Sequence, residues 1–189
     1  MIIYRCKWVT NDPLYIEYHD NEWGIPKYGD KELFELLILE TMQAGISWIT
    51  ILKKRENYRQ SLDNFDPEKI ALYDKDKVEI LLSNPGIIRN RLKLESIINN
   101  AKAYLAIKKE FGSFSDYIWK FVYYKPIINN WNTHEQIPVF TDLSNKLSID
   151  LKKRGFKFVG SIICYAFMQA SGMVNDHISN CFCHNSLNI

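Results

Sequence analysis

The chain has 189 residues, 47% of them hydrophobic and 14% aromatic, which is enough apolar material for a real core in one domain or two small ones. Its formal net charge of +2 is too small to indicate a partner. The start, "MIIYRCKWVTND", has no long apolar run, so we expect neither a secretory signal nor a membrane span, and four cysteines without such a signal favour a reducing compartment over a disulfide framework.

The first clear helical pattern begins at Asp30, a good N-cap residue, and ends at Gly45. Its sequence, "LFELLILETMQ", is almost entirely apolar, as is typical of a buried helix. Glu35 and Glu40 lie about 140° apart on the helical wheel, so one narrow solvent stripe does not hold both. We place Glu35 beside Glu32 on the exposed side. Glu40 then either reaches water at a frayed helix end or faces a cavity and lacks a hydrogen-bond donor.

The remaining segments also read as helices, and strand-like alternation is scarce, so the predicted fold class is all-α. Capping residues and glycines set the expected limits: Ser47 and Thr141 begin helices, and Gly112, Gly155 and Gly172 end them. Segment 123–140 has two prolines and no clear period, and it reads as a loop. The expected helices are 47–55, 55–62, 67–73, 76–83, 89–109, 113–122, 142–154 and 161–171.

Basic residues gather in three clusters, at 53–55, 89–93 and 152–157. Each cluster either meets a phosphate backbone or balances the dipole of a last helical turn. The second cluster follows a predicted helix hairpin around 76–105 with Gly86 at its apex. A hairpin of this kind presents backbone N–H groups to a phosphate, although an ordinary helix–helix turn has the same sequence pattern.

Cysteine and histidine residues near the two ends of the chain are candidate metal ligands. His177 and Cys181 lie four residues apart, so one helical turn brings both to one ion. Cys6 and His19 complete a two-Cys, two-His set, and zinc bound there would tie the two ends of the chain together. The spacing matches no standard zinc finger and does not decide whether a metal binds. Cys183 and His184 are competing ligands, and Cys164 is expected in the core.

Aromatic residues crowd into the first quarter of the chain. Most of them are expected in the core, and a few could form walls that enclose a flat ring. The group consists of Trp8, Tyr15, Tyr18, Trp23 and Trp48.

Four blocks of the sequence resemble the DNA-3-methyladenine glycosylase I family, the TAG-type enzymes of the helix-hairpin-helix superfamily. They are "YRCKWVTNDPLYIEYHDNEWG", "LETMQAGISWITILKKRENYR", "NPGIIRNRLK" and "LKKRGFKFVGSIICYAFMQASGMVNDH", in the family's order. The resemblance implies one compact helical glycosylase domain over residues 1–189, active as a monomer in the bacterial cytoplasm and not at a membrane. It implies an enzyme that flips N3-methyladenine out of alkylated double-stranded DNA and hydrolyses its N-glycosidic bond, leaving an abasic site without cutting the strand.

The resemblance also implies roles for single residues in the base pocket. Glu40 matches the family's pocket carboxylate, which accepts a hydrogen bond from the exocyclic amine of the methylated base. Trp48 matches the residue that stacks on the flipped ring, and Tyr18, Trp8 and Trp23 match further lining of the pocket.

A second set of implied roles concerns the DNA duplex and the metal. Ile46 matches an apolar plug that fills the gap left in the duplex, with Gln43 and Gly45 beside it. The segment from Pro85 to Arg91 matches the part that holds the phosphate backbone, through Gly86, Arg89 and Arg91. Four residues match the family's zinc ligands, and a closed set of four protein ligands implies a structural zinc ion. These ligands are Cys6, His19, His177 and Cys181.

The helix after the hairpin lacks the catalytic aspartate that many members of the superfamily carry there. Glu95 is present, but it reads as a solvent-facing residue of a long helix. This agrees with the TAG branch, in which a cationic base is already a good leaving group. The sequence also allows two other functions: a DNA-binding module without catalysis, and a zinc hydrolase or deaminase that uses the same four ligands. The second lacks the sequence signature of the zinc deaminases.

Overall fold

The computed structural model describes residues 3–184, and most of these residues are helical, which confirms the all-α fold class. Among them, none of the helices has both the length and the apolar character of a membrane span. The helices are α1 (Pro13–Asn21), α2 (Asp30–Gln43), α3 (Trp48–Ser61), η1 (Asp63–Phe65), α4 (Pro67–Ile70), α5 (Lys75–Ser83), α6 (Arg91–Phe111), α7 (Phe114–Trp119), η2 (Lys120–Val122), η3 (His134–Gln136), α8 (Asp142–Lys153) and α9 (Ser161–Ala170). Strands β1 (Ile127–Ile128) and β2 (Val174–Asn175) pair in parallel.

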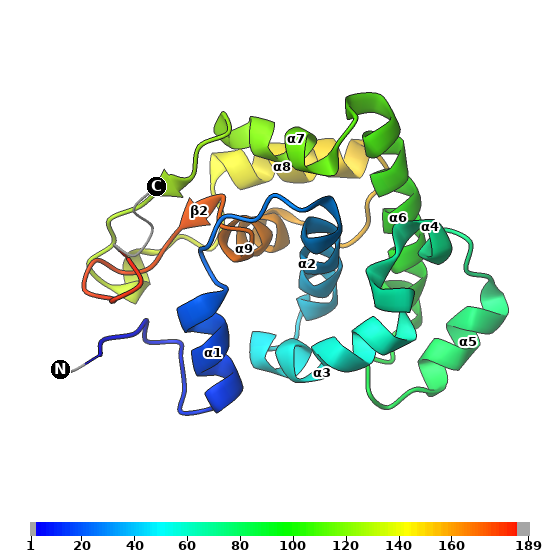
Figure 1. Ribbon diagram of the computed structural model, residues 1–189, viewed down its shortest axis with the longest axis horizontal. Helices are drawn as coiled ribbons and strands as arrows, with labels where there is room; N and C mark the ends of the chain where they lie inside the picture. The colour runs from blue at the N-terminus through cyan, green and yellow to red at the C-terminus, as the bar shows by residue number, and fades with distance from the viewer. Residues whose placement is uncertain (1–2, 185–189) are drawn as a thin grey trace.

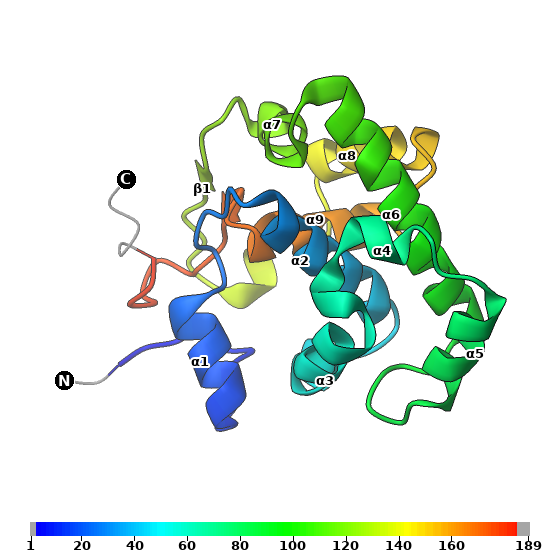
Figure 2. The ribbon, with the colours of Figure 1, turned by 45° about the vertical axis from the view of Figure 1, so that its right-hand side comes forward.

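The helices α2 and α9 form the centre of the fold. Figure 1 shows them in the middle, with α3 below, α6 to the right and α7 with α8 above. Helix α9 packs against α2 and α8, and α6 packs against α2, α4, α5 and α7. Figure 2, turned by 45°, shows α5 beside the lower part of α6. The first and last described segments lie together on the left of Figure 1, on the side opposite the α5–α6 pair.

The structure departs from the predicted helices at three places. Helix α1 was not predicted, although Asp12 followed by Pro13 is the same signal that predicts the helix at 67; the Asp12 side chain accepts the Leu14 N–H at 3.1 Å. The two helices predicted at 47–55 and 55–62 are one continuous helix, α3. The helix predicted at 67–73 ends after one turn as α4, and Asp74 then caps α5.

Asp30 does not cap α2, contrary to the prediction. Gly29 occupies the N-cap position, and Asp30 is the first helical residue. Its Oδ1 atom accepts hydrogen bonds from the Ser113 hydroxyl and the Ser115 N–H, both at 2.8 Å. The carboxylate therefore caps the start of α7 and fixes that helix to α2, because an acceptor at a helix N-terminus satisfies its free N–H groups.

Glu35 also differs from its predicted place on the exposed face. Its Oε1 atom accepts from the guanidinium groups of Arg55 and Arg59 on α3, each at 2.8 Å. Arg55 forms a further ion pair with Glu22 at 2.6 Å. Glu35 thus faces α3 and not water, and this pairing links the two helices.

The predicted hairpin is formed by α5, the turn at residues 84–90 and α6. Helix α3 supports this turn: the Tyr58 hydroxyl accepts the Ile88 N–H at 3.1 Å. A Cβ atom on Gly86 would lie 2.8 Å from Asn57 Cγ, closer than side chains normally pack. A larger residue at the apex would have to displace the Asn57 and Asn84 side chains, and glycine lets the turn lie directly against α3.

Candidate active site

A cavity of about 170 Å³, of a size that suits one nucleobase, is bounded by residues of the N-terminal segment, α1 and the turn after it, α2, α3, α9 and the 123–140 segment. All five residues expected in the base pocket line it: Trp8, Tyr18, Trp23, Glu40 and Trp48. Gln43, expected beside the DNA plug, lines the same cavity. The other lining residues are Tyr15, His134, Ile137, Ala166 and Gln169.

Glu40 lies in the last turn of α2 and is only 2% exposed. Its Oε2 atom is buried and has no hydrogen-bond partner among the described residues. Burial raises the pKa of Glu40 from the ordinary 4.5 to about 8, because a medium of low dielectric disfavours the charged form. The frayed-end alternative, in which Glu40 reaches water, is therefore wrong. The carboxyl group lies at the cavity and lacks a donor, a state that costs free energy until a ligand supplies one.

The raised pKa of Glu40 predicts that the folded protein loses stability as the pH rises. Between pH 4.5 and 8 the unfolded chain has released the Glu40 proton while the folded chain still binds it. The free energy of unfolding therefore falls by up to about 5 kcal/mol across this window. We expect urea unfolding to show this decrease in the wild type and not in Glu40→Gln. Equal pH slopes in the two proteins would contradict a buried, protonated carboxyl group.

Aromatic rings form the walls around Glu40. The Tyr18 and Trp48 rings lie 5.3 Å apart between centroids, tilted by 50°. Trp8 meets Trp23 edge to face at 5.1 Å and lies 5.0 Å from Tyr15. Trp48 Nε1 is buried and, like Glu40 Oε2, has no partner among the described residues. Flat apolar walls combined with unpaired polar atoms suit a planar ligand that also carries hydrogen-bonding edges.

The turn after α2 carries the residues expected to enter the duplex. Gly45 has a φ of +76°, which side chains rarely adopt, and the half-buried Ile46 follows it. Lys93 Nζ, from the first turn of α6, donates to the carbonyl oxygens of Met42 at 2.7 Å and Ala44 at 2.6 Å. This buried ammonium satisfies the free carbonyl groups at the end of α2. It also connects the turn directly to the hairpin helix.

The hairpin residues expected at the phosphate backbone differ in their surroundings. The Gly86 N–H donates to Asn84 Oδ1 at 2.7 Å, so a phosphate there would have to replace this bond. Arg91 forms an ion pair with Glu79 at 2.7 Å. Arg89 is exposed and, within residues 3–184, forms no ion pair. Its guanidinium group is the hairpin cation best able to meet a phosphate.

We expect Arg89→Ala to weaken binding to methylated and undamaged DNA by the same factor. Each phosphate contact contributes about one unit to the slope of log K against log salt, so this slope should fall by about 1. Arg91→Ala should change it less, because Glu79 already neutralises that guanidinium. Lys109→Ala, at the far end of α6, serves as the control. The same slope for Arg89→Ala and Lys109→Ala would contradict a phosphate contact at Arg89.

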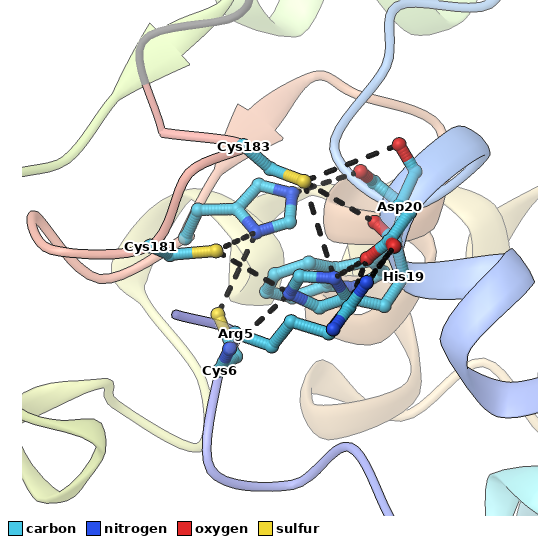
Figure 3. A network of polar contacts seen from close by, with 8 residues as sticks. Arg5, Cys6, His19, Asp20, Cys181 and Cys183 are labelled. Atoms are coloured by element: carbon cyan, nitrogen blue, oxygen red, sulfur yellow. Dashed lines mark hydrogen bonds and ion pairs between the residues drawn. The ribbon is translucent and has the colours of Figure 1, made fainter. Parts of the chain in front are cut away.

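Cys6, His19, His177 and Cys181 form one buried cluster whose ligand atoms all lie within 4.8 Å of one another. Figure 3 shows Cys6, His19 and Cys181 pointing toward a common centre from the N-terminal segment, α1 and the C-terminal segment. Sulfur and nitrogen are 3.5 Å apart in three pairs: Cys6–His177, Cys181–His177 and Cys181–His19. Zinc bonds of about 2.3 Å to sulfur and 2.0 Å to nitrogen at a tetrahedral angle give this same separation of about 3.5 Å.

The second nitrogen of each imidazole is also paired, as in metal centres. His19 Nδ1 donates to Asp20 Oδ1 at 2.7 Å, and His177 Nε2 donates to the Trp23 carbonyl oxygen at 3.1 Å. Arg5 holds the Asp20 carboxylate, with the shortest of three bonds at 2.6 Å. These contacts leave His19 Nε2 and His177 Nδ1 as the two nitrogen atoms that face the sulfur atoms.

Of the two competing ligands, Cys183 lies beside the cluster and His184 faces away from it. Cys183 Sγ is 3.9 Å from the Nδ1 atom of His19, whereas the four-residue cluster uses Nε2; with His19 and Asp20 it forms a second, three-residue group. His184 faces the 123–140 segment, where its Nε2 atom lies 3.0 Å from a backbone carbonyl oxygen. Cys164 is buried in α9, which confirms its predicted place in the core.

Asp176, next to His177, joins the cluster to the cavity. The carboxylate is fully buried. Its Oδ1 atom accepts from Asn129 Nδ2 and Trp131 Nε1, both at 2.7 Å. Its Oδ2 atom accepts from the Tyr165 hydroxyl at 2.6 Å and from Gln169 Nε2 at 2.7 Å. Four donors from the 123–140 segment and α9 thus meet on one side chain.

We expect Asp176→Asn to lower the free energy of unfolding by about 3 kcal/mol. Each carboxylate oxygen of Asp176 accepts two hydrogen bonds, and the asparagine NH₂ that replaces one oxygen cannot accept them, so two buried donors lose their acceptor. Urea unfolding followed by circular dichroism measures this change. Asp116→Asn, at an exposed position of α7, is the matched control and should change stability by less than about 0.5 kcal/mol. Equal stability of the two variants would contradict the role of Asp176 as the common acceptor.

The sequence patterns did not identify four of the lining residues. Ala166 and Gln169 lie three apart on α9, and a glutamine in such an apolar helix is the same signal that singled out Glu40. His134 and Ile137 lie in the 123–140 segment, where no periodicity assigns a side chain to a face. Their positions depend on how Asp176 and β2 hold this segment against the core.

The fold is all-helical, and it carries a helix hairpin with a basic flank. It also has an aromatic cavity of the size of one base that contains a buried carboxyl group. These features together define the class of helical DNA glycosylases. The model of the methyladenine glycosylase family matches residues 8–184, and the chain belongs to this family.

Named relatives resemble the chain over almost its whole length. The DNA-3-methyladenine glycosylase 1 of Escherichia coli (strain K12) is 53% identical over 180 residues, which cover 95% of this chain and 96% of that protein. A crystal structure of a 3-methyladenine DNA glycosylase I superimposes with a TM-score of 0.94 at 55% identity and covers 96% of this chain and 100% of that one. A tyrosine-to-phenylalanine variant of such an enzyme in complex with 3-methyladenine gives 0.91 at 40% identity, covering 94% and 95%.

Proposed function

We propose that the chain excises N3-methyladenine from alkylated DNA by hydrolysing the N-glycosidic bond, as a base-excision repair enzyme. Membership of the methyladenine glycosylase family supports this function. The observation that carries it is the buried, unpaired carboxyl oxygen of Glu40 on a base-sized aromatic cavity. A DNA-binding module without catalysis has no use for such a costly group.

The cavity residues act on the flipped base in complementary ways. Trp48 stacks on one face of the base, Tyr18 lines the pocket beside it, and Glu40 accepts a hydrogen bond from its exocyclic amine. The ionised carboxylate also favours the positive charge of the methylated ring. A flipped base fills the cavity and supplies the donor that Glu40 lacks, so part of the cost of extrusion is offset by these contacts.

The bond then breaks without a protein acid. Water adds to the anomeric carbon, the electron pair of the C–N bond leaves with the cationic base, and the water releases a proton to solvent. Phosphate groups stabilise the positive charge that develops on the sugar. Glu95 is exposed on α6, which fits the expectation that no acid follows the hairpin. A neutral, undamaged adenine is a poor leaving group and should be released far more slowly.

We also propose one structural zinc ion bound by Cys6, His19, His177 and Cys181. The donor set, the sulfur–nitrogen separations and the outer contacts of both imidazoles all fit a closed tetrahedral site. A closed site has no position for water. This separates the proposal from a zinc hydrolase or deaminase, which would need an open position.

The setting of the reaction follows from the proposed activity. We propose that the chain works as one glycosylase domain and as a monomer, and that it acts on double-stranded DNA in the bacterial cytoplasm. Ile46 would fill the gap in the duplex, with Gln43 and Gly45 beside it, and Arg89, Gly86 and Arg91 would lie along the phosphate backbone.

The test is base release. Methylated duplex DNA is incubated with the protein, and the freed bases and the DNA strands are separated by chromatography. We expect 3-methyladenine as the main product, little 7-methylguanine and intact strands that carry abasic sites. No release of base, with DNA binding and zinc binding both intact, would overturn the proposal in favour of a binding module.

A further inference from the structure

His134 is a further polar residue of the cavity, and it comes from a different part of the chain than Glu40. Three buried side-chain atoms within residues 3–184 have no hydrogen-bond partner: Glu40 Oε2, Trp48 Nε1 and His134 Nδ1. All three belong to residues that line the same cavity. Each such atom costs free energy in the empty protein, so their convergence on one cavity points to a ligand that satisfies them together.

The position of His134 is fixed by its neighbours. It begins η3, whose N-cap Thr133 forms a capping box with Gln136. Glu135 also forms an exposed ion pair with Lys7 of the N-terminal segment at 3.1 Å. Trp131, three residues earlier, is held by Asp176 at 2.7 Å. An anchored segment that leaves one ring nitrogen buried and unpaired is typical of a preorganised binding group.

The chemistry of an adenine edge indicates what this nitrogen meets. The exocyclic amine is the only donor group on the edge, and Glu40 takes it in the proposed function. The remaining unsubstituted ring nitrogens, N1 and N7, are acceptors that flank the amine, whereas N3 carries the methyl group. A second protein group beside Glu40 must therefore donate to complement this edge. A neutral imidazole protonated on Nδ1 does so.

We propose that His134 is a specificity residue of the base pocket, whose Nδ1–H donates a hydrogen bond to N1 or N7 of the flipped 3-methyladenine. The proposal rests on the proposed function and extends it. Glu40 and His134 together read an acceptor beside a donor, and this pair distinguishes the adenine edge from that of guanine, which presents two acceptors, O6 and N7, in place of the amine and N7.

The first test uses three variants with free 3-methyladenine in isothermal titration calorimetry. His134→Phe keeps a ring and removes both nitrogens, so we expect its dissociation constant to rise about tenfold. His134→Asn places an amide group near the position of Nδ1 and should recover most of this loss. His134→Gln places its amide group near the position of Nε2 and should not. Unchanged affinity in the Phe variant, or equal losses in all three, would overturn the proposal.

The second test identifies the acceptor on the base. We expect wild-type protein to bind either 7-deaza- or 1-deaza-3-methyladenine about tenfold more weakly than 3-methyladenine, whereas His134→Phe should not distinguish that analogue from the parent base. Additive effects of the variant and of both analogues would overturn the hydrogen bond, because they show no coupling.

Two controls separate the possible failures. Duplex DNA with a stable abasic-site analogue has no base, so all variants should bind it as the wild type does. Wild-type protein that releases no 3-methyladenine from methylated DNA would show that the proposed function itself fails. A third outcome is release of 3-methyladenine by the wild type and equally fast release by His134→Phe, measured with methylated DNA at a concentration too low to saturate the enzyme. This would overturn only the role of His134.

Discussion

Glu40→Gln should release 3-methyladenine from methylated DNA about 10²- to 10³-fold more slowly than the wild type, while binding DNA with the same affinity. Glutamine keeps the size and an acceptor oxygen, but it carries no charge to stabilise the cationic base. Single-turnover release with enzyme in excess measures the chemical step and excludes an effect of product release. The same variant should be more stable than the wild type at pH 8, because it removes a carboxyl group whose pKa burial raises to about 8.

The matched control is Glu95→Gln on the exposed face of α6. It removes the same charge near the hairpin, and release should stay within about twofold of the wild type, as for most surface substitutions. Equal slowing in both variants would mean that only net charge matters. A Glu40→Gln protein with full activity and unchanged stability would contradict the pocket carboxylate altogether.

Loss of the proposed zinc ion should both destabilise the fold and disable the pocket. The cluster joins the N-terminal segment, α1 and the C-terminal segment, and His177 contacts the pocket residue Trp23 with ring centroids 4.6 Å apart. We expect Cys181→Ser to lower the free energy of unfolding by on the order of 4 kcal/mol and to lose most base release. Atomic absorption should find one zinc per wild-type chain and much less in this variant.

Cys164→Ser provides the control for the thiol substitution, since Cys164 is buried in α9 and lies outside the cluster. It should keep one zinc per chain. Cys183→Ala tests the competing ligand in the same way, and we expect it to keep the ion as well. Wild-type protein that is folded and active after complete removal of zinc would contradict a structural role for the metal.

The fold and the centre of the candidate site could be predicted from local patterns, and the reason is physical. Helix limits follow from caps and glycines, which act within a few residues. Thr141 caps α8 as expected, and the structure adds a complete capping box with Ser144. Glu40 could be found because an almost entirely apolar helix has little solvent-facing surface on which a carboxylate can lie. The four cluster residues could be proposed from residue type, although only the fold brings the two ends of the chain together.

Long-range pairing determined what could not be predicted. Asp30 caps α7, more than eighty residues away, and Glu35 pairs with α3, so neither position follows from the helical wheel. His134 reaches the cavity because Asp176 holds its segment, and no local pattern encodes that contact. Gln43 is on the expected turn but lines the base cavity, because α2 continues to Gln43 and its last turn faces inward.

The most direct measurement is the ionisation of Glu40 itself, followed through the ¹³C resonance of its side-chain carboxyl group as the pH is varied. In the empty protein we expect a midpoint near pH 8. Saturating 3-methyladenine should move this midpoint below pH 7, because a hydrogen bond from the amine favours the ionised form. A midpoint near the ordinary 4.5 that the base does not change would contradict a buried carboxyl group that reads the base.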